Sequence, residues 1–87
     1  MTAAIEKLFR ALSNRQRLKI IEILRRKPTS VVGLSELLKL SYKSTHQHVN
    51  HLMAVGFLDK ERQSNIVLYS IDKDLPKFAR ILLDLLK

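Results

Sequence analysis

The most constraining feature of the sequence is a change of periodicity at Gly56. Before it, apolar residues in the segment Tyr42–Val55 recur at helical spacing. After it come Phe57–Arg62, where charges of opposite sign alternate, and Ile66–Ile71, which is rich in β-branched and aromatic residues. A short polar connection, Gln63-Ser64-Asn65, separates the two segments. The pattern predicts a helix that ends at Gly56 and is followed directly by a β-hairpin.

Three more helices are expected before Gly56 and one after the hairpin. The first covers about Thr2–Leu12, and the second runs to about Arg26, since the residue before Pro28 avoids helical dihedrals. The third covers about Val31–Lys39 and is followed by the turn Leu40-Ser41. After Asp72–Pro76, the last helix covers about Leu75–Lys87.

Small polar residues precede several of these helices. Ser30 and Ser41 are placed to cap the third and fourth helices by accepting a hydrogen bond from a first-turn N–H. Before the second helix, Ser13 and Asn14 both offer a cap, and Ser13-x-x-Gln16 has the form of a capping box. The second helix is expected to be the most buried, with apolar residues at Leu18, Ile20, Ile21, Ile23 and Leu24.

The predicted fold is mostly α with a small β-hairpin, in the order helix-helix-helix-helix-hairpin-helix. That order is typical of a winged helix-turn-helix. A chain of 87 residues corresponds to a single domain, residues 1–87, with the N- and C-terminal helices available to form a dimer seam. So short a chain buries only about 60–65% of its unfolded surface, and a dimer would bury more.

Composition narrows the class of protein. The chain has no cysteine, which excludes disulfides and thiolate metal sites and fits a cytoplasmic protein. The first segment lacks the apolar core of a signal peptide, and no apolar run is long enough to span a membrane. The formal net charge of +8 favours a polyanionic partner, with nucleic acid ahead of a membrane surface or an acidic protein. Solubility alone is the competing explanation.

The fourth helix carries the strongest functional signal, because no acidic residue lies between Glu36 and Asp59. With Val49 set inward, alongside Thr45 and Leu52, the outward face is polar. Amide, hydroxyl and lysine side chains suit base edges and phosphates in the major groove of duplex DNA. The alternative is an ordinary solvated face. The expected DNA contacts of this helix and its cap are Ser41, Tyr42, Lys43, Ser44, His46, Gln47, His48, Asn50 and His51.

The hairpin would supply a second contact. Lys60, Arg62 and Ser64 lie near its polar tip and are expected to meet phosphate or the minor groove, with Arg62 the preferred contact. The alternative is a solvated hairpin.

The three histidines raise the alternative of a metal site. His48 and His51 are three residues apart, whereas His46 and His48 diverge by about 200° on a helix. Two imidazoles without a nearby carboxylate or thiolate rarely form a specific site. We therefore expect no metal and no cofactor, and histidines that donate to phosphates or bases. Binding should then strengthen as pH falls through about 6.5.

From about Phe9 to Asp72 the sequence resembles the ArsR-type winged-helix repressors. The resemblance implies a homodimer whose recognition helices enter successive major grooves of an operator, and release of DNA when a metal or small effector binds. Its reading positions fall on Lys43, Ser44, His46, Gln47 and His48. The matching pieces are Ala11-Leu12-Ser13-Asn14, Arg17-Leu18-Lys19-Ile20, Leu37-Leu38-Lys39-Leu40-Ser41, Ser44-Thr45-His46-Gln47-His48-Val49-x-x-Leu52, Val55-Gly56-Phe57-Leu58 and Tyr69-Ser70-Ile71.

The chain departs from that family at three places. The segment Val31–Leu38 lacks the cysteines with which many members bind metal, and Asp84 stands alone where others have an Asp/His set in the last helix. Both departures argue against a metal sensor. Lys39 takes a place where the family often has glycine, which affects only the local turn.

The last helix is too apolar for one packing face, with Leu75, Phe78, Leu82 and Leu85 at 3-4-3 spacing. It either packs against the first helix inside one chain or forms a two-fold seam with a second copy. The seam would place two reading helices about 34 Å apart on a pseudo-palindromic site. The expected interface residues are Ile5, Leu8, Phe78, Ile81, Leu82, Leu85 and Leu86.

We therefore predict a sequence-specific double-stranded DNA-binding transcriptional regulator, a repressor by resemblance. The sequence lacks a glycine-rich phosphate loop, a carboxylate pair and a Ser–His–acid set, so an enzyme is not expected. The main rival is a winged-helix protein–protein interaction module of the transcription machinery. RNA binding is disfavoured because only 6% of residues are aromatic. The effector is unknown, and a domain this small is expected to have almost no room for a ligand pocket.

Overall fold

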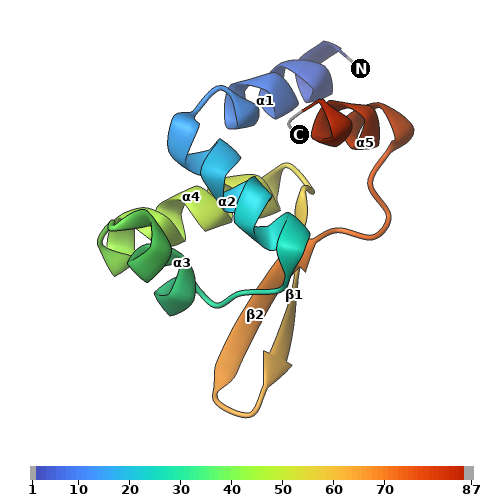
Figure 1. The fold of residues 1–87 in the computed structure, drawn as a ribbon. Helices are drawn as coiled ribbons and strands as arrows, with labels where there is room; N and C mark the ends of the chain where they lie inside the picture. Colours follow the sequence, from blue (N-terminus) through green and yellow to red (C-terminus); the bar gives the residue numbers. More distant parts are fainter. Residues whose placement is uncertain (1, 86–87) are drawn as a thin grey trace.

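The computed structural model describes residues 2–85 (Figure 1). Within that range the order of elements confirms the predicted fold class. A two-stranded antiparallel hairpin stands between the fourth and fifth helices. The elements are α1 (Thr2–Leu12), α2 (Arg15–Arg26), α3 (Val31–Leu38), α4 (Tyr42–Ala54), β1 (Leu58–Gln63), β2 (Ile66–Ile71) and α5 (Lys77–Asp84).

The predicted caps Ser30 and Ser41 are confirmed, whereas the capping-box form at Ser13 is not realised. Ser30 Oγ accepts from the Gly33 N–H at 3.1 Å, and Ser41 Oγ accepts from the Ser44 N–H at 3.0 Å. At the start of α2, however, the cap is Asn14, whose Oδ1 accepts from the backbone N–H of Arg17. Ser13 belongs to the end of α1 instead, where its hydroxyl donates to the Phe9 carbonyl at 2.8 Å. There is accordingly no capping box at this junction.

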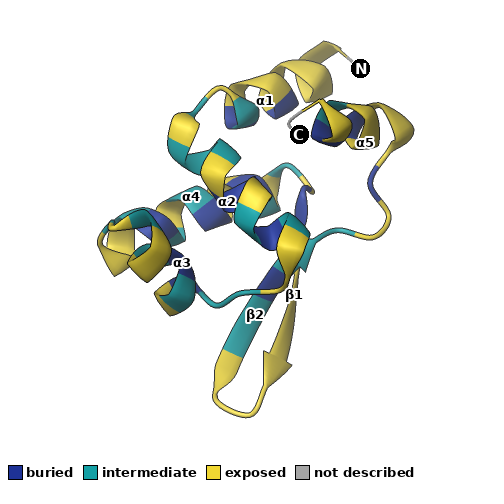
Figure 2. Ribbon diagram, in the orientation of Figure 1, coloured by how far each residue is buried: buried dark blue, intermediate teal, exposed yellow. Residues whose placement is uncertain are grey.

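The core is centred on α2, which crosses the middle of the molecule (Figure 2). Ile20 and Ile21 are fully buried and Leu24 almost so, whereas Leu18 and Ile23 are only half-buried. Around them pack buried side chains of every other element. Each large aliphatic or aromatic side chain buried in this way stabilises the fold by about 1.5–3 kcal/mol relative to exposure. The fully buried large side chains are Ile20, Ile21, Leu34, Thr45, Val49, Leu52 and Phe57.

Two helix ends use the left-handed backbone region. Gly56 has φ 78° and ends α4 as predicted. A Cβ built there would meet nothing within 4 Å, so glycine is favoured by its backbone alone. Lys39 ends α3 with φ 58° and does carry a Cβ, which costs about 1–2 kcal/mol. The glycine-to-lysine departure noted in the sequence therefore falls on a strained turn.

The hairpin pairs Leu58 with Ile71 and Gln63 with Ile66, which leaves a two-residue turn. The first strand begins one residue later than predicted because Phe57 belongs to the core. Its N–H donates to the Leu52 carbonyl and its own carbonyl accepts from Asp72, each at 3.0 Å. These bonds fix the base of the hairpin against the end of α4.

Helices α1 and α5 lie side by side at the end of the molecule opposite the hairpin tip (Figure 1). Arg25 of α2 attaches α5 to the core, because its guanidinium donates to the Leu83 carbonyl and lies 3.8 Å from a carboxylate oxygen of Asp84. Asp84, isolated in the sequence pattern, thus forms an ion pair. None of the helices within residues 2–85 combines the length and the apolar character needed to cross a membrane.

Candidate nucleic-acid interface

Helix α4 is held to the core by one face and exposes the other. Thr45, Val49 and Leu52 are completely buried, as predicted for its inner stripe. The Thr45 hydroxyl donates to the Ser41 carbonyl at 2.9 Å, so this buried polar group is satisfied. The predicted outward residues are all at least partly accessible. Those exposed are Ser41, Tyr42, Lys43, Gln47, Asn50 and His51, and those half-buried are Ser44, His46 and His48.

Three of these side chains are arranged around one another on the first turns of α4. The Tyr42 ring stacks on the His46 imidazole, with centroids 5.7 Å apart and an interplanar angle of 11°. Asn50 Nδ2 lies 3.4 Å from His46 Nδ1 on the other side. The two residues of each pair are four positions apart in the sequence and are therefore neighbours on one face of the helix. Lys43 and Gln47 make no hydrogen bond to any other described residue, which leaves their polar atoms free for a ligand.

His48 differs from the other two histidines, because it lies at the junction of α4 and α2. Its Nδ1 is 3.4 Å from Nη1 of Arg17. Burial, and then the positive charges of Arg17 and His51, hold the pKa of His48 below its ordinary value of 6.5. This works against the predicted gain of charge at His48 near pH 6.5, since the local field opposes protonation.

The hairpin places its three predicted contacts in solvent. Lys60, Arg62 and Ser64 are exposed, and Ser64 occupies the tight turn with φ 56°. A groove of about 500 Å³ runs between this hairpin and the start of α4, lined among others by Tyr42, His46 and the half-buried or exposed residues of β2. The start of α4 and the strand β2 therefore border one concave surface, which the start of α3 also lines.

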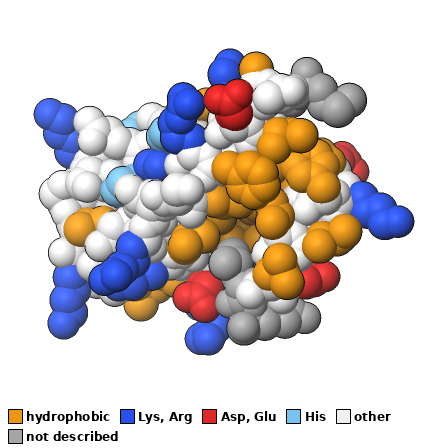
Figure 3. Space-filling model, turned by 90° about the horizontal axis from the view of Figure 1, so that it is seen from above, with side chains coloured by type: hydrophobic (Ala, Val, Ile, Leu, Met, Phe, Trp, Pro, Cys, Tyr) orange, Lys and Arg blue, Asp and Glu red, His pale blue; other side chains and the backbone are white. Residues whose placement is uncertain are grey.

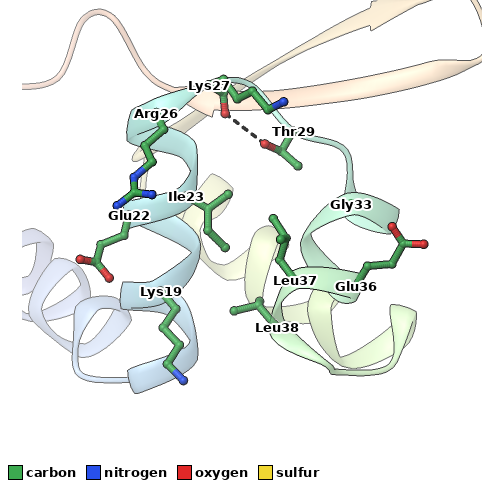
Figure 4. A pocket seen from close by; sticks show the side chains of 10 residues that line it. All are labelled: Lys19, Glu22, Ile23, Arg26, Lys27, Thr29, Gly33, Glu36, Leu37 and Leu38. Carbon is green, nitrogen blue, oxygen red and sulfur yellow. Dashed lines mark hydrogen bonds between the residues drawn. The ribbon is translucent and has the colours of Figure 1, made fainter.

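A second groove, of about 760 Å³, lies between α2 and α3. Ile23, Leu37 and Leu38 point into the gap between the two helices, and basic and acidic side chains stand around it (Figure 4). This is more open space than the sequence led us to expect in so small a domain.

The predicted seam is a continuous apolar surface over α1 and α5 (Figure 3). Two of its predicted members differ from the rest: Leu8 is 5% exposed and belongs to the chain's own core, and Leu82 is half-buried against that core. Leu86 lies outside the described residues. Phe9, which the interface prediction omitted, is 51% exposed, and its four-residue spacing from Ile5 is the sequence signal that would have placed it there. The exposed members are Ile5, Phe9, Phe78, Ile81 and Leu85.

Between α1 and α5 this surface is hollowed by a cleft of about 270 Å³ with a mainly apolar lining, including Phe9, Leu12 and Leu82. Elsewhere, among residues 2–85, no three His, Cys, Asp or Glu side chains are grouped closely enough to share a metal ion.

Comparison with known proteins places this geometry among DNA-binding proteins. Residues 14–60 match the profile of the bacterial regulatory proteins of the arsR family. No curated protein sequence matches the chain. Among solved structures, HlyU from Vibrio cholerae is 27% identical, with 98% of this chain and 89% of that chain covered and a TM-score of 0.84. NolR from Sinorhizobium fredii is 25% identical, with coverages of 97% and 82% and a TM-score of 0.82.

A third structure shares the fold at lower identity. The homodimeric winged helix-turn-helix DNA-binding domain of a Mycobacterium bovis protein is 18% identical, covers 97% of this chain and 75% of its own, and has a TM-score of 0.83. The arrangement of α3, α4 and the hairpin is accordingly a winged helix-turn-helix, in which the hairpin is the wing.

Proposed function

This chain belongs to the arsR family of bacterial regulatory proteins, and we propose that it acts as a homodimer that binds a specific site in double-stranded DNA. The observation that carries the proposal is the outward face of α4, which is polar, free of acidic residues and half-buried to exposed along its whole length. Carboxylates at these positions would repel phosphate, whereas lysine and amide groups bind base edges and backbone.

The wing would make the second contact on the same duplex. With α4 in the major groove, Lys60 and Arg62 extend toward the neighbouring phosphates or minor groove. The net charge of +8 supplies the long-range attraction that brings the domain to DNA. Ser41 and Ser44, at the N-terminus of α4, are placed where helix N–H groups favour a phosphate.

The two-fold seam is proposed to be the apolar surface formed by Ile5, Phe9, Phe78, Ile81 and Leu85. Five exposed large apolar side chains on two adjacent helices form a patch of the kind that monomers seldom leave open. The Mycobacterium bovis domain, which shares this fold, is homodimeric. A dimer places two copies of α4 about 34 Å apart, facing a pseudo-palindromic site, and occupation of such a site in a promoter would repress transcription.

Titration of duplex DNA at several salt concentrations, with genomic fragments as competitors, tests the proposal. We expect log affinity to fall steeply with log salt, since several phosphates lose counterions, and one fragment to compete best. A flat salt slope with no preferred fragment would contradict DNA reading and favour a protein-binding module. Regulation in the repressing sense is then tested with a reporter behind the preferred fragment.

A further inference from the structure

Arg17 occupies an unusual position for a residue in the first turn of a helix. Its backbone N–H donates to the Asn14 cap at 3.1 Å, while its side chain leaves α2 altogether. The guanidinium Nε donates to the Ala11 carbonyl, and Nη2 donates to the Arg10 carbonyl at 3.2 Å. Both carbonyls belong to the last turn of α1, where carbonyl groups lack helical partners and attract a cation.

The remaining nitrogen of the same guanidinium reaches the reading helix. Nη1 of Arg17 lies 3.4 Å from Nδ1 of His48, across 31 residues of sequence. Three helices thus meet at one side chain: the end of α1, the start of α2 and the middle of α4. Because Arg17 is half-buried and two of its contacts are to backbone, its position is set independently of His48.

Arg17 restricts which ring nitrogen of His48 can carry a hydrogen. A guanidinium has only donors, so the ring nitrogen that faces it must present a lone pair. A hydrogen on Nδ1 would point at the N–H groups and positive charge of Arg17, and a doubly protonated ring would face the same charge. Among the described residues no carboxylate lies within ion-pair distance of His48 to offset this, and the other charged neighbour, His51 on α4, acts in the same direction.

We propose that Arg17 is a positioning residue that holds His48 as a neutral imidazole with its hydrogen on Nε2, so that the reading helix presents a donor there. This inference rests on the proposed DNA-binding function and adds a specificity to it. A donor that cannot accept selects acceptors: N7 of guanine or adenine, O6 of guanine, O4 of thymine, or a phosphate oxygen. The proposal also gives α1, at the seam, a direct connection to the base-reading surface.

The tautomer is tested on the free protein by long-range ¹⁵N–¹H NMR of the histidine rings across a pH titration. We expect His48 to show an unprotonated Nδ1 and a protonated Nε2 at neutral pH. In Arg17→Gln we expect a mixture of tautomers and a midpoint that moves up toward 6.5. Arg15→Gln is the matched control, because it removes the same charge from an exposed side chain two residues away and should leave the His48 signals unchanged.

A wild-type His48 with its hydrogen on Nδ1, or identical spectra in wild type and Arg17→Gln, would overturn the proposal. Neither result depends on DNA, so failure here is separate from failure of the proposed function. If Arg17→Gln does not fold, as shown by circular dichroism, the wild-type spectrum still decides the tautomer.

Two His48 variants test the readout on DNA without touching Arg17. Glutamine places an amide near Nε2 and asparagine places it near Nδ1. On the preferred fragment, His48→Gln should stay within about twofold of wild type, while His48→Asn should lose about two- to tenfold, the value of one hydrogen bond. Equal affinities for the two variants would contradict a donor role for Nε2.

Discussion

Thr29 and Tyr69 are joined by two reciprocal backbone hydrogen bonds. The Thr29 N–H donates to the Tyr69 carbonyl at 3.0 Å, and the Tyr69 N–H donates to the Thr29 carbonyl at 2.9 Å. This antiparallel bridge ties the connection between α2 and α3 to the outer edge of β2. The wing is therefore attached to the helix-turn-helix through the backbone as well as through side-chain packing.

Replacement of Thr29 by proline should loosen the wing, because proline has no N–H and leaves the Tyr69 carbonyl without its donor. We expect the free energy of unfolding to fall by about 1–3 kcal/mol in urea titrations. Thr29→Ala is the matched control, since it keeps the N–H and loses only an exposed hydroxyl bond to the Lys27 carbonyl. Equal losses in the two variants would show that the backbone bridge contributes nothing.

Lys39→Gly should stabilise the domain. Glycine removes the cost of placing lysine in the left-handed region, about 1–2 kcal/mol. Part of this gain is offset because glycine makes the unfolded chain more flexible and so stabilises the unfolded state. The expected net gain is about 0.5–1 kcal/mol, measured as a rise in melting temperature. Lys39→Ala removes the same charge but keeps the Cβ, so it should show no gain, and a gain as large as that of glycine would point to charge instead.

Ile81→Glu should convert the proposed dimer to a monomer, because it places a charge on the proposed seam at a side chain that is 52% exposed in one chain. Sedimentation equilibrium should then give 10.1 kDa instead of twice that mass. Leu37→Glu makes the same kind of change at an exposed residue of α3 and should remain dimeric. A dimer that persists in Ile81→Glu would move the seam elsewhere.

Two variants on α4 should separate base reading from phosphate binding. Gln47→Ala should cost about 1–3 kcal/mol on the preferred fragment and little on others, if the amide makes a bidentate base contact. If Lys43 contacts phosphate, Lys43→Ala should weaken binding to all fragments alike and lower the salt slope by about one. Fluorescence anisotropy over a salt series measures both quantities. If Gln47→Ala weakened binding to every duplex equally, Gln47 would be a phosphate contact and not a base contact.

Stability should depend on pH through His48. Its pKa is lowered in the folded chain, so between that pKa and 6.5 the unfolded chain binds more protons, and stability rises with pH across this window. The contribution is present in full above 6.5 and is lost as pH falls toward the folded value. Urea titrations from pH 7.5 downward should show this loss, and His48→Gln should show a flatter curve. If the wild type and His48→Gln lost stability in parallel as pH falls, the pH dependence would come from a group other than His48.

The elements of this fold were predictable because their signals are local. Ser30, Ser41 and Gly56 act on backbone groups within a few residues of themselves, and the inner stripe of α4 follows directly from helical spacing. The sequence left the cap at the α1–α2 junction open because Ser13 and Asn14 both suit it, and only the course of the chain decides between them.

The contacts that distinguish one histidine from another were not predictable. Arg17 and His48 are far apart in sequence, and no period or motif relates an arginine in one helix to an imidazole in another. For the same reason the burial of Leu8 could not be separated from the exposure of Ile5 and Phe9, since all three suit one apolar stripe. Helical spacing identifies a stripe but does not say which part of it another helix covers.

The burial pattern of β1 has a consequence for the behaviour of the protein on DNA. After Leu58 the strand is exposed, and four successive residues, Asp59, Lys60, Glu61 and Arg62, alternate in sign along its free edge. An unpaired strand edge is a template for adding further strands, and charged side chains along such an edge oppose that addition. Charged side chains on this edge therefore discourage neighbouring wings, on DNA or in solution, from joining edge to edge into a common sheet.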